Sequence, residues 1–256
     1  MDRAKLDSLF DLTGRVAIVT GGTRGIGLAI AEGYVAAGAK VVVASRKPEA
    51  CEAAEAHLRE RGGDVLGVPT HMGDLDSIAA VVDRTVEHFG ALDIVVNNAA
   101  NPLALPIGAY TPEGFDKSIG VNVRGPVFLI QAALPHLEAS DHAAVLNVIT
   151  VGAFQFADFV SIYAAGKAAL LSFTRSMAAN FAPRGIRINA LAPGAVDTDM
   201  VRNNPQPVQD LLAGSSLMRR LASPDEMVGP ALLLTSDAGS FITGQVMVVD
   251  GGLLPH

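Results

Sequence analysis

The chain has 256 residues, of which half are hydrophobic and 18% are charged. Its formal net charge of −7 at pH 7 argues against nucleic-acid binding, because phosphate backbones are bound by clustered cationic side chains. The single cysteine, Cys51, excludes an intrachain disulfide and favours a reducing compartment. The six histidines have no ligand-like spacing, so we expect no metal site.

The chain start and the apolar runs indicate a cytoplasmic protein. Residues 1–5 are too polar for a secretory signal peptide, and no apolar run approaches the roughly 18 residues that a membrane helix needs. No linker divides the sequence, so we expect residues 1–256 to form a single domain.

Short runs rich in Val and Ile alternate with longer helical patterns along most of the chain. Several of these runs lack polar alternation, which is typical of parallel strands covered by helices on both faces. The predicted strands lie near 15–20, 40–45, 65–70, 92–97, 144–149, 186–191 and 246–249. The predicted helices lie near 25–37, 49–61, 75–89, 113–138, 161–182 and 224–235. We therefore predict an α/β fold with one doubly wound parallel sheet of the Rossmann type, about seven strands, and a ligand site at the carboxyl edge.

Residues 195–223 interrupt this alternation. They contain Asn203-Asn204-Pro205-Gln206-Pro207 and no strand pattern. Long excursions in a compact domain often cover a binding site, so this segment is predicted to be a substrate lid.

A glycine-rich turn follows the first strand directly and opens the first long helix. Residues 20–27 read Thr-Gly-Gly-Thr-Arg-Gly-Ile-Gly, a G-x-x-x-G-x-G spacing that matches the commonest dinucleotide pattern only in part. Glycine lets the backbone turn sharply beside a pyrophosphate, and the helix N-terminus supplies unpaired N–H groups. The turn predicts a phosphate site formed by Gly21, Thr23, Arg24, Gly25, Ile26 and Gly27.

A tyrosine and a lysine share one face of the predicted helix 161–182. Tyr163 and Lys167 are four residues apart, about one helical turn. Taken alone, this spacing also fits a half-buried tyrosine beside a solvated lysine. Thr150 ends the preceding strand, however, and strand ends of a wound sheet face the ligand crevice. Thr150 and Tyr163 can therefore reach one substrate oxygen.

Several motifs in order along residues 12–252 resemble the short-chain dehydrogenase/reductase family in its shorter, single-domain subtype. Within that family the chain is most similar to the 3-oxoacyl-thioester reductases and related ketone or alcohol oxidoreductases. The motifs are residues 20–27, Asn97-Asn98-Ala99, Asn122, Tyr163 with Lys167, 193–198, and Asp250-Gly251-Gly252.

This resemblance implies a role for each catalytic candidate. Tyr163 would donate a proton during carbonyl reduction and accept one during alcohol oxidation, although an isolated tyrosine has a pKa near ~10. Lys167 would lower the pKa of this phenol and bind the ribose hydroxyls beside the nicotinamide. Thr150 would donate to the substrate oxygen. Asn122 would hold a water, or its amide could satisfy a helix irregularity, and both can be true.

Three positions depart from the family pattern without removing a functional group. Thr150 stands where serine is usual, and its methyl group stiffens the side chain and narrows the site. Ala100 replaces a glycine, and Gly166 replaces a small polar residue at a cost of roughly 0.5–1 kcal/mol relative to alanine in a helix.

The end of the second strand favours NADP(H) over NAD(H). It reads Val43-Ala44-Ser45-Arg46-Lys47 and lacks the carboxylate that binds the adenosine ribose in NAD enzymes. Arg46 and Arg24 are suited to a 2′-phosphate, because a guanidinium binds phosphate through two N–H groups. The other predicted cofactor-binding residues are Ser45, His71, Met72, Asn97, Ala99, Tyr163, Lys167, Pro193, Gly194, Val196 and Thr198. His71 is equally consistent with an ordinary strand-end residue.

The substrate side of the site is predicted to be apolar. Its candidate walls are Phe154, Gln155, Phe156, Phe159, Met200, Leu211, Leu212 and Leu217, which indicate a moderately hydrophobic ketone or secondary alcohol. Arg202, Arg219 and Arg220 could instead steer an acidic carrier or a thioester. The sequence leaves the substrate open.

Two other functions compete with an oxidoreductase. One is a noncatalytic NADP(H)-binding sensor or scaffold, which would have no need of Tyr163. The other is an epimerase or dehydratase, although such relatives tend to carry a separate substrate lobe. The resemblance also implies a homotetramer, with the long helices of 113–138 and 161–182 at one interface.

Overall fold

The computed structural model describes residues 1–254, and all seven predicted strands are present. Seven strands form one parallel sheet in the order β3-β2-β1-β4-β5-β6-β7. The chain therefore winds outward from β1 in one direction and from β4 in the other, and the winding reverses between these two strands. The strands are β1 (Val16–Thr20), β2 (Lys40–Ser45), β3 (Val65–Pro69), β4 (Ile94–Asn97), β5 (Ala144–Val148), β6 (Arg187–Pro193) and β7 (Val246–Val249).

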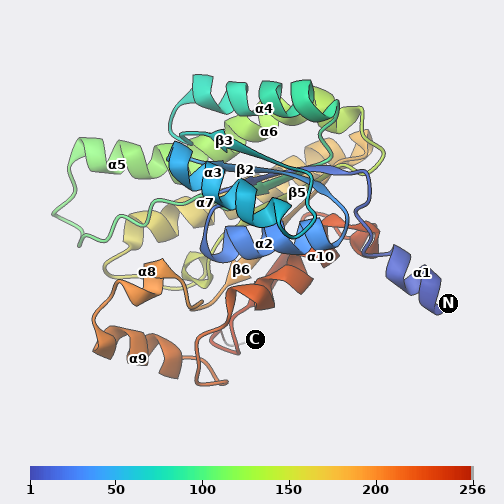
Figure 1. Cartoon of the computed structure of the whole chain (residues 1–256). Coiled ribbons are helices and arrows are strands. Elements are labelled where there is room, and N and C mark those ends of the chain that lie inside the picture. Colours follow the sequence, from blue (N-terminus) through green and yellow to red (C-terminus); the bar gives the residue numbers. More distant parts are fainter. Residues whose placement is uncertain (255–256) are drawn as a thin grey trace.

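Helices cover both faces of the sheet (Figure 1), so the predicted fold class is confirmed. On one face lie α2 (Gly25–Ala36), α3 (Pro48–Arg59) and α10 (Val228–Thr235). On the other lie α4 (Leu75–Phe89), α6 (Gly125–Glu138) and α7 (Ser161–Phe181). Alternate strand residues enter the two layers: Val41 and Val43 pack against the first, and Val42 packs against the second. This double burial explains the uninterrupted apolar strands.

The helix expected over 113–138 is divided into three pieces. Helix α5 (Pro112–Ile119) passes into a π-helical turn, η1 (Gly120–Arg124), and then into α6. A π-helical turn inserts an extra residue into the helix and changes the direction of its side chains. Asn122 lies in this turn, so the suggested helix irregularity is present.

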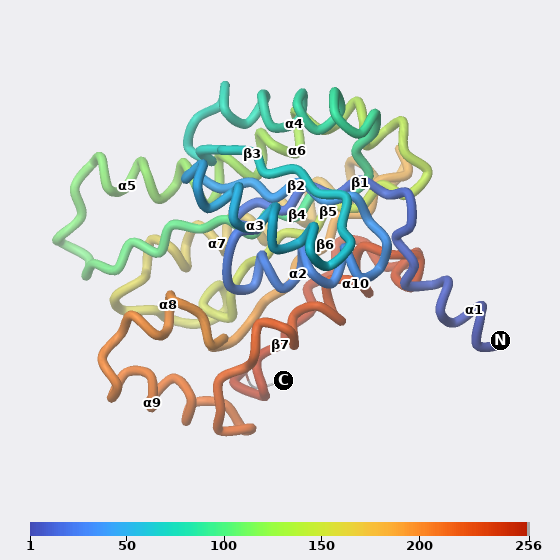
Figure 2. The backbone as a smooth tube through the Cα atoms, in the orientation of Figure 1, coloured from blue at the N-terminus to red at the C-terminus, as the bar shows by residue number. Residues whose placement is uncertain are grey.

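Two parts of the chain contain helices that the sequence analysis did not predict. Near the N-terminus, α1 (Arg3–Ser8) is capped by Asp2, whose side chain accepts from the backbone N–H of Lys5. The 195–223 excursion holds α8 (Asp199–Arg202) and α9 (Gln206–Gly214), which extend away from the sheet (Figure 2). Both α8 and α9 are short, and each lacks the long periodic pattern that predicts a helix. Short 3-10 turns complete the described helices: η2 (Val151–Ala153), η3 (Ala182–Arg184), η4 (Pro224–Met227) and η5 (Asp237–Gly239).

Candidate active site

A cleft of about 540 Å³ opens at the carboxyl edge of the sheet. It spans the point where the winding reverses, which is where doubly wound sheets bind ligands. Thr20, at the end of β1, connects β1 to the end of β4, the two strands between which the winding reverses. Its hydroxyl donates to the carbonyl of Val96 and accepts from the backbone N–H groups of Asn98 and Ala99. This connection fixes the glycine turn against the end of β4.

The glycine turn forms one wall of the cleft. Gly21 has a φ of 65°, and a β-carbon on Gly27 would collide with the carbonyl oxygen of Gly21, so the turn depends on both glycines. No side chain caps the N-terminus of α2, which leaves its first N–H groups facing the cleft. The turn therefore fits a pyrophosphate group.

Most of the predicted site residues line this one cleft. From the glycine turn these are Gly21, Thr23, Arg24, Gly25, Ile26 and Gly27, and from the ends of β2 to β4 they are Ser45, Arg46, Met72 and Ala99. From β5, α7 and the segment after β6 they are Thr150, Tyr163, Lys167, Pro193, Gly194, Val196 and Thr198. Residues more than 170 positions apart in the sequence thus share one cavity.

Three predicted site residues do not line the cleft. The side chain of Asn97 is buried and donates to Asn147 Oδ1 on the neighbouring strand at 2.9 Å, so the prediction that this side chain binds the cofactor is wrong. Its neighbour Asn98 lines the cleft instead and donates to the carbonyls of Thr20 and Gly21. The exchange has a simple cause, because adjacent residues of a strand face opposite sides.

His71 and Asn122 are the other two. The Nδ1 atom of His71 accepts from the backbone N–H of Gly73 at 3.1 Å, which matches an ordinary strand-end role. The amide of Asn122 is fully buried and bonds both backbone groups of Asn101, at 2.8 and 3.0 Å. Asn122 thus anchors the cleft-lining segment that follows Asn98, and it lies behind the cleft wall.

Tyr163 and Lys167 lie together at the cleft. The Lys167 Nζ atom is 5.8 Å from the centre of the Tyr163 ring and donates to the carbonyl of Val148 at 2.7 Å. Burial lowers the pKa of Lys167 to about 8 and raises the pKa of Tyr163 to about 12. In the chain by itself the pKa of the phenol is therefore raised by burial, opposite in direction to the lowering expected from Lys167.

The hydroxyl of Thr150 caps the short turn η2 by accepting from the backbone N–H of Gly152 at 3.2 Å. This bond leaves the hydroxyl proton free to point elsewhere, since it uses only a lone pair. Thr150 and Tyr163 border the same cleft, so both can approach a carbonyl oxygen placed there.

The predicted substrate wall is only partly present. Met200 lines the cleft, whereas Phe154, Phe156 and Phe159 lie outside its lining and are 42%, 89% and 67% exposed. Sequence reasoning missed Asn101, Lys117, Asp199 and Asn203, which also line the cleft. Asn101 closely follows the Asn97-Asn98-Ala99 motif, and Asp199 and Asn203 lie in the predicted lid, but no local pattern marked these side chains as facing the cleft.

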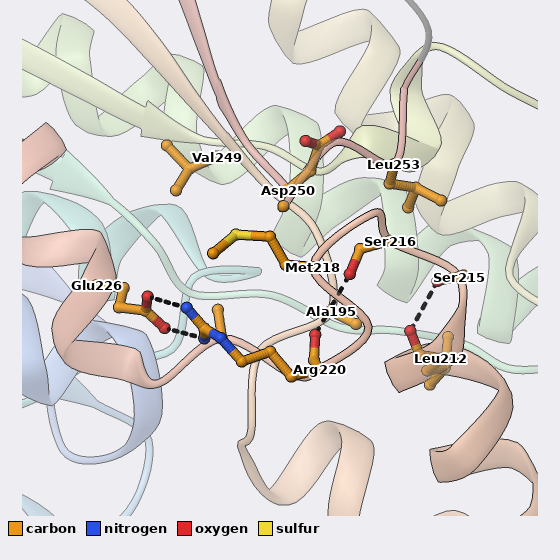
Figure 3. Close-up of a pocket in the computed structure, with 12 residues that line it drawn as sticks. Ala195, Leu212, Ser215, Ser216, Met218, Arg220, Glu226, Val249, Asp250 and Leu253 are labelled. Carbon is orange, nitrogen blue, oxygen red and sulfur yellow. Dashed lines mark hydrogen bonds and ion pairs between the residues drawn. The ribbon is translucent and has the colours of Figure 1, made fainter.

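Two of the three arginines proposed to steer an acidic substrate are already paired. Arg202 holds Asp197 through two N–H groups at 2.7 and 2.9 Å. Arg220 holds Glu226 in the same way at 2.7 Å, which lowers the pKa of Glu226 to about 2 (Figure 3). Their charges are thus largely neutralised by carboxylates within the chain.

A smaller cavity of about 80 Å³ lies beside this second pair (Figure 3). It separates the end of α9 from the residues that follow β7, and Leu212, Met218 and Leu253 form its apolar lining. Leu212, predicted as a substrate wall, therefore borders this cavity and not the main cleft.

No helix within residues 1–254 combines the length and apolar character needed to cross a bilayer. The same residues contain no cluster of three or more histidine, cysteine or acidic side chains that could hold a metal ion.

Comparisons with known proteins agree with this geometry. A family model described as enoyl-(acyl carrier protein) reductase matches residues 21–254. The short-chain dehydrogenase/reductase SDRA of Arabidopsis thaliana is 37% identical over 94% of this chain and 95% of its own length. The cis-4-hydroxycyclohexanecarboxylate dehydrogenase of Sinomonas cyclohexanicum is 39% identical over 93% of this chain and 96% of its own length.

Solved structures resemble nearly the whole chain as well. The crystal structure of a 3-oxoacyl (acyl-carrier-protein) reductase from Agrobacterium tumefaciens, with NADP bound, superimposes with a TM-score of 0.90. It is 34% identical, and the match covers 96% of this chain and 97% of the reductase.

Proposed function

Because the chain belongs to the short-chain dehydrogenase/reductase family, we propose that it is an NADP(H)-dependent oxidoreductase that interconverts a ketone and a secondary alcohol. One observation carries the proposal. A single cleft brings together the glycine turn, two arginines, and the Tyr163, Lys167 and Thr150 side chains. A noncatalytic nucleotide sensor has no need of the last three.

The cleft residues fit NADP(H). The N-terminus of α2 and the glycine turn would hold the pyrophosphate, and Arg24 with Arg46 would hold the 2′-phosphate. Lys167 would bind the nicotinamide ribose, and Val196 with Thr198 would bind the carboxamide. When bound, the cofactor supplies or accepts the hydride. NADP in the 3-oxoacyl reductase structure supports the same cofactor here.

Tyr163 is the proposed general acid and base. During reduction its hydroxyl, which burial keeps protonated, would donate a proton to the developing alkoxide while Thr150 donates a hydrogen bond to the same oxygen. The buried ammonium of Lys167 would stabilise the phenolate that remains. Asn122, through its bonds to Asn101, would position the wall that faces these groups.

We propose a neutral, moderately hydrophobic ketone as the substrate class. Met200 provides an apolar wall, and the pairing of Arg202 and Arg220 with carboxylates argues against an acidic carrier bound by these residues. The 195–223 excursion, within one domain of 1–256, is the proposed lid over this substrate.

A homotetramer belongs to the same proposal. Helices α5, α6 and α7 each expose an aromatic residue, Phe115 (46%), Phe128 (37%) and Phe173 (39%), which suits a subunit interface. Light scattering on the purified protein tests this: a tetramer supports the proposal and a monomer contradicts it.

The proposed activity is tested by a panel of ketones and alcohols with NADPH and NADH, followed by the absorbance of reduced nicotinamide. Tyr163→Phe should lower turnover by at least about a hundredfold while NADPH still binds, because the acid is lost and the phosphate contacts remain. Tyr34→Phe, which removes the buried hydroxyl of an α2 residue that bonds Thr235 outside the cleft lining, is the matched control and should retain activity. Near-normal turnover of Tyr163→Phe would contradict the acid assignment.

A further inference from the structure

We infer that Asp199 weakens the NADP(H) preference by competing with the cofactor 2′-phosphate for Arg24. This inference rests on the proposed cofactor. It assigns Asp199 as a specificity-determining residue on the wall opposite the glycine turn.

The two walls of the cleft meet at this point. Arg24 Nη1 lies 3.1 Å from Asp199 Oδ2, and both residues line the cleft. The adjacent residues Gly25 and Thr198 are also close, because a β-carbon on Gly25 would lie 3.1 Å from Thr198 Cγ2. Arg24 directly precedes α2 and Asp199 begins α8, so the ion pair joins the cofactor side of the cleft to the base of the proposed lid.

The contact involves a single nitrogen of the guanidinium and is largely exposed. The side chains of Arg24 and Asp199 are 74% and 52% exposed, so solvent screens their attraction and the pair is readily broken. A 2′-phosphate carries more negative charge than a carboxylate and accepts two parallel N–H bonds from one guanidinium. It can therefore displace Asp199 from Arg24.

Displacement leaves Asp199 with another cation nearby. The guanidinium of Arg202, on the same helix, is held by Asp197, and its pKa is raised further by the charge of Asp199. Arg46, by contrast, makes no ion pair with any residue of 1–254, so it is available to the phosphate from the start. Of Arg24 and Arg46, only Arg24 has a carboxylate, that of Asp199, competing with the 2′-phosphate for its guanidinium.

The competition affects one cofactor only. NADP(H) must break the Arg24–Asp199 pair to engage Arg24, whereas NAD(H) has no 2′-phosphate and leaves the pair intact. Removing the carboxylate should therefore tighten NADPH by about two- to fivefold, the range expected for an exposed ion pair, without changing NADH.

The test is a fluorescence titration of NADPH and NADH into wild type, Asp199→Asn, Arg24→Gln and the double variant at low salt. Asp199→Asn should tighten NADPH alone, and this gain should disappear when Arg24 is already Gln. Asp83→Asn on α4, outside the cleft lining, controls for the change in net charge. High salt should shrink the gain, because screening weakens the Arg24–Asp199 ion pair that NADPH must break.

Unchanged or weaker NADPH binding in Asp199→Asn would overturn the inference, as would a gain that persists without Arg24. A separate result would contradict the proposed NADP(H) preference itself. If Arg24→Gln and Arg46→Gln leave the NADPH-to-NADH affinity ratio unchanged, the NADP(H) proposal itself is wrong.

Discussion

Lys167 shows how a functional side chain can oppose stability. It is 1% exposed, and burial lowers its pKa to about 8. Its hydrogen bond to the carbonyl of Val148 offsets only part of the cost of removing an amine from water. A residue placed for packing alone would be apolar here, so the buried amine indicates a role in the cleft.

Replacing Lys167 with methionine should therefore stabilise the fold while abolishing activity. The folded-state pKa of Lys167 is depressed, so the buried charge destabilises the chain below about pH 8, and this penalty fades as pH rises toward the unfolded value near ~10.4. Below pH 8 we expect a gain of about 2 kcal/mol in unfolding free energy from urea denaturation, shrinking at higher pH. A pH-independent loss of stability would contradict this reading.

The phenol of Tyr163 should titrate at unusually high pH. Burial raises its pKa to about 12, so it stays protonated through the range where ordinary tyrosines ionise. The tyrosinate absorbance of wild type minus Tyr163→Phe, measured by rapid pH jump, should show a midpoint near 12. Saturating NADP⁺ should lower that midpoint, because its nicotinamide ring is positive. A midpoint near ~10 without cofactor would show that burial is not dominant.

At the scale of elements, the π-helical turn η1 determines how one side of the cleft is built. A β-carbon on Gly125, which directly follows this turn as the first residue of α6, would collide with the carbonyl oxygen of Met72 in the connection between β3 and α4. On the other side, a β-carbon on Gly166 of α7 would lie 3.3 Å from Asn122 Cβ. Glycine thus lets the turn approach both neighbours and places the Asn122 amide against Asn101.

The two glycines should respond differently to alanine. Gly125→Ala should cost at least about 2–3 kcal/mol of unfolding free energy, because a backbone carbonyl cannot move aside. Gly166→Ala should change stability by less than about 1 kcal/mol, since better helix propensity offsets a tight contact that a small shift relieves. Thermal or urea unfolding of both variants compares them directly, and equal losses would contradict this account.

At the scale of the whole molecule, an ion pair and a second arginine connect chain segments at the edge of the sheet opposite the cleft. Arg15, just before β1, is buried and pairs with Asp237 of η5 at 2.8 Å. Arg187, which begins β6, donates to the carbonyls of Leu234 and Ser236 close to the same carboxylate. The carboxylate of Asp237 therefore interacts with two guanidinium groups, those of Arg15 and Arg187, which are far apart in the sequence.

Asp237→Asn should destabilise the fold without affecting the cleft. The buried guanidinium of Arg15 would lose its partner, and because Asp237 is itself 46% exposed we expect about 1–3 kcal/mol. Urea unfolding measures the loss, and cofactor affinity should stay unchanged. Asp83→Asn, an exposed change on α4, is the control. If Asp237→Asn were as stable as wild type, water would be replacing the carboxylate as the partner of Arg15, which would contradict this account.

The sequence by itself determined the parallel sheet, the strand positions and most of the cleft residues. Continuous apolar strands, a glycine turn after β1 and a Tyr163–Lys167 pair on one helix face are local patterns, and local patterns can be read along the chain.

Only the tertiary structure decided which of two neighbours faces the cleft, as with Asn97 and Asn98, and which charges are already paired, as with Arg24 and Asp199. It also reversed the expected shift in the pKa of Tyr163, because burial depends on all the elements that surround a group. Pairing and burial join residues far apart in the chain, and no local pattern records them.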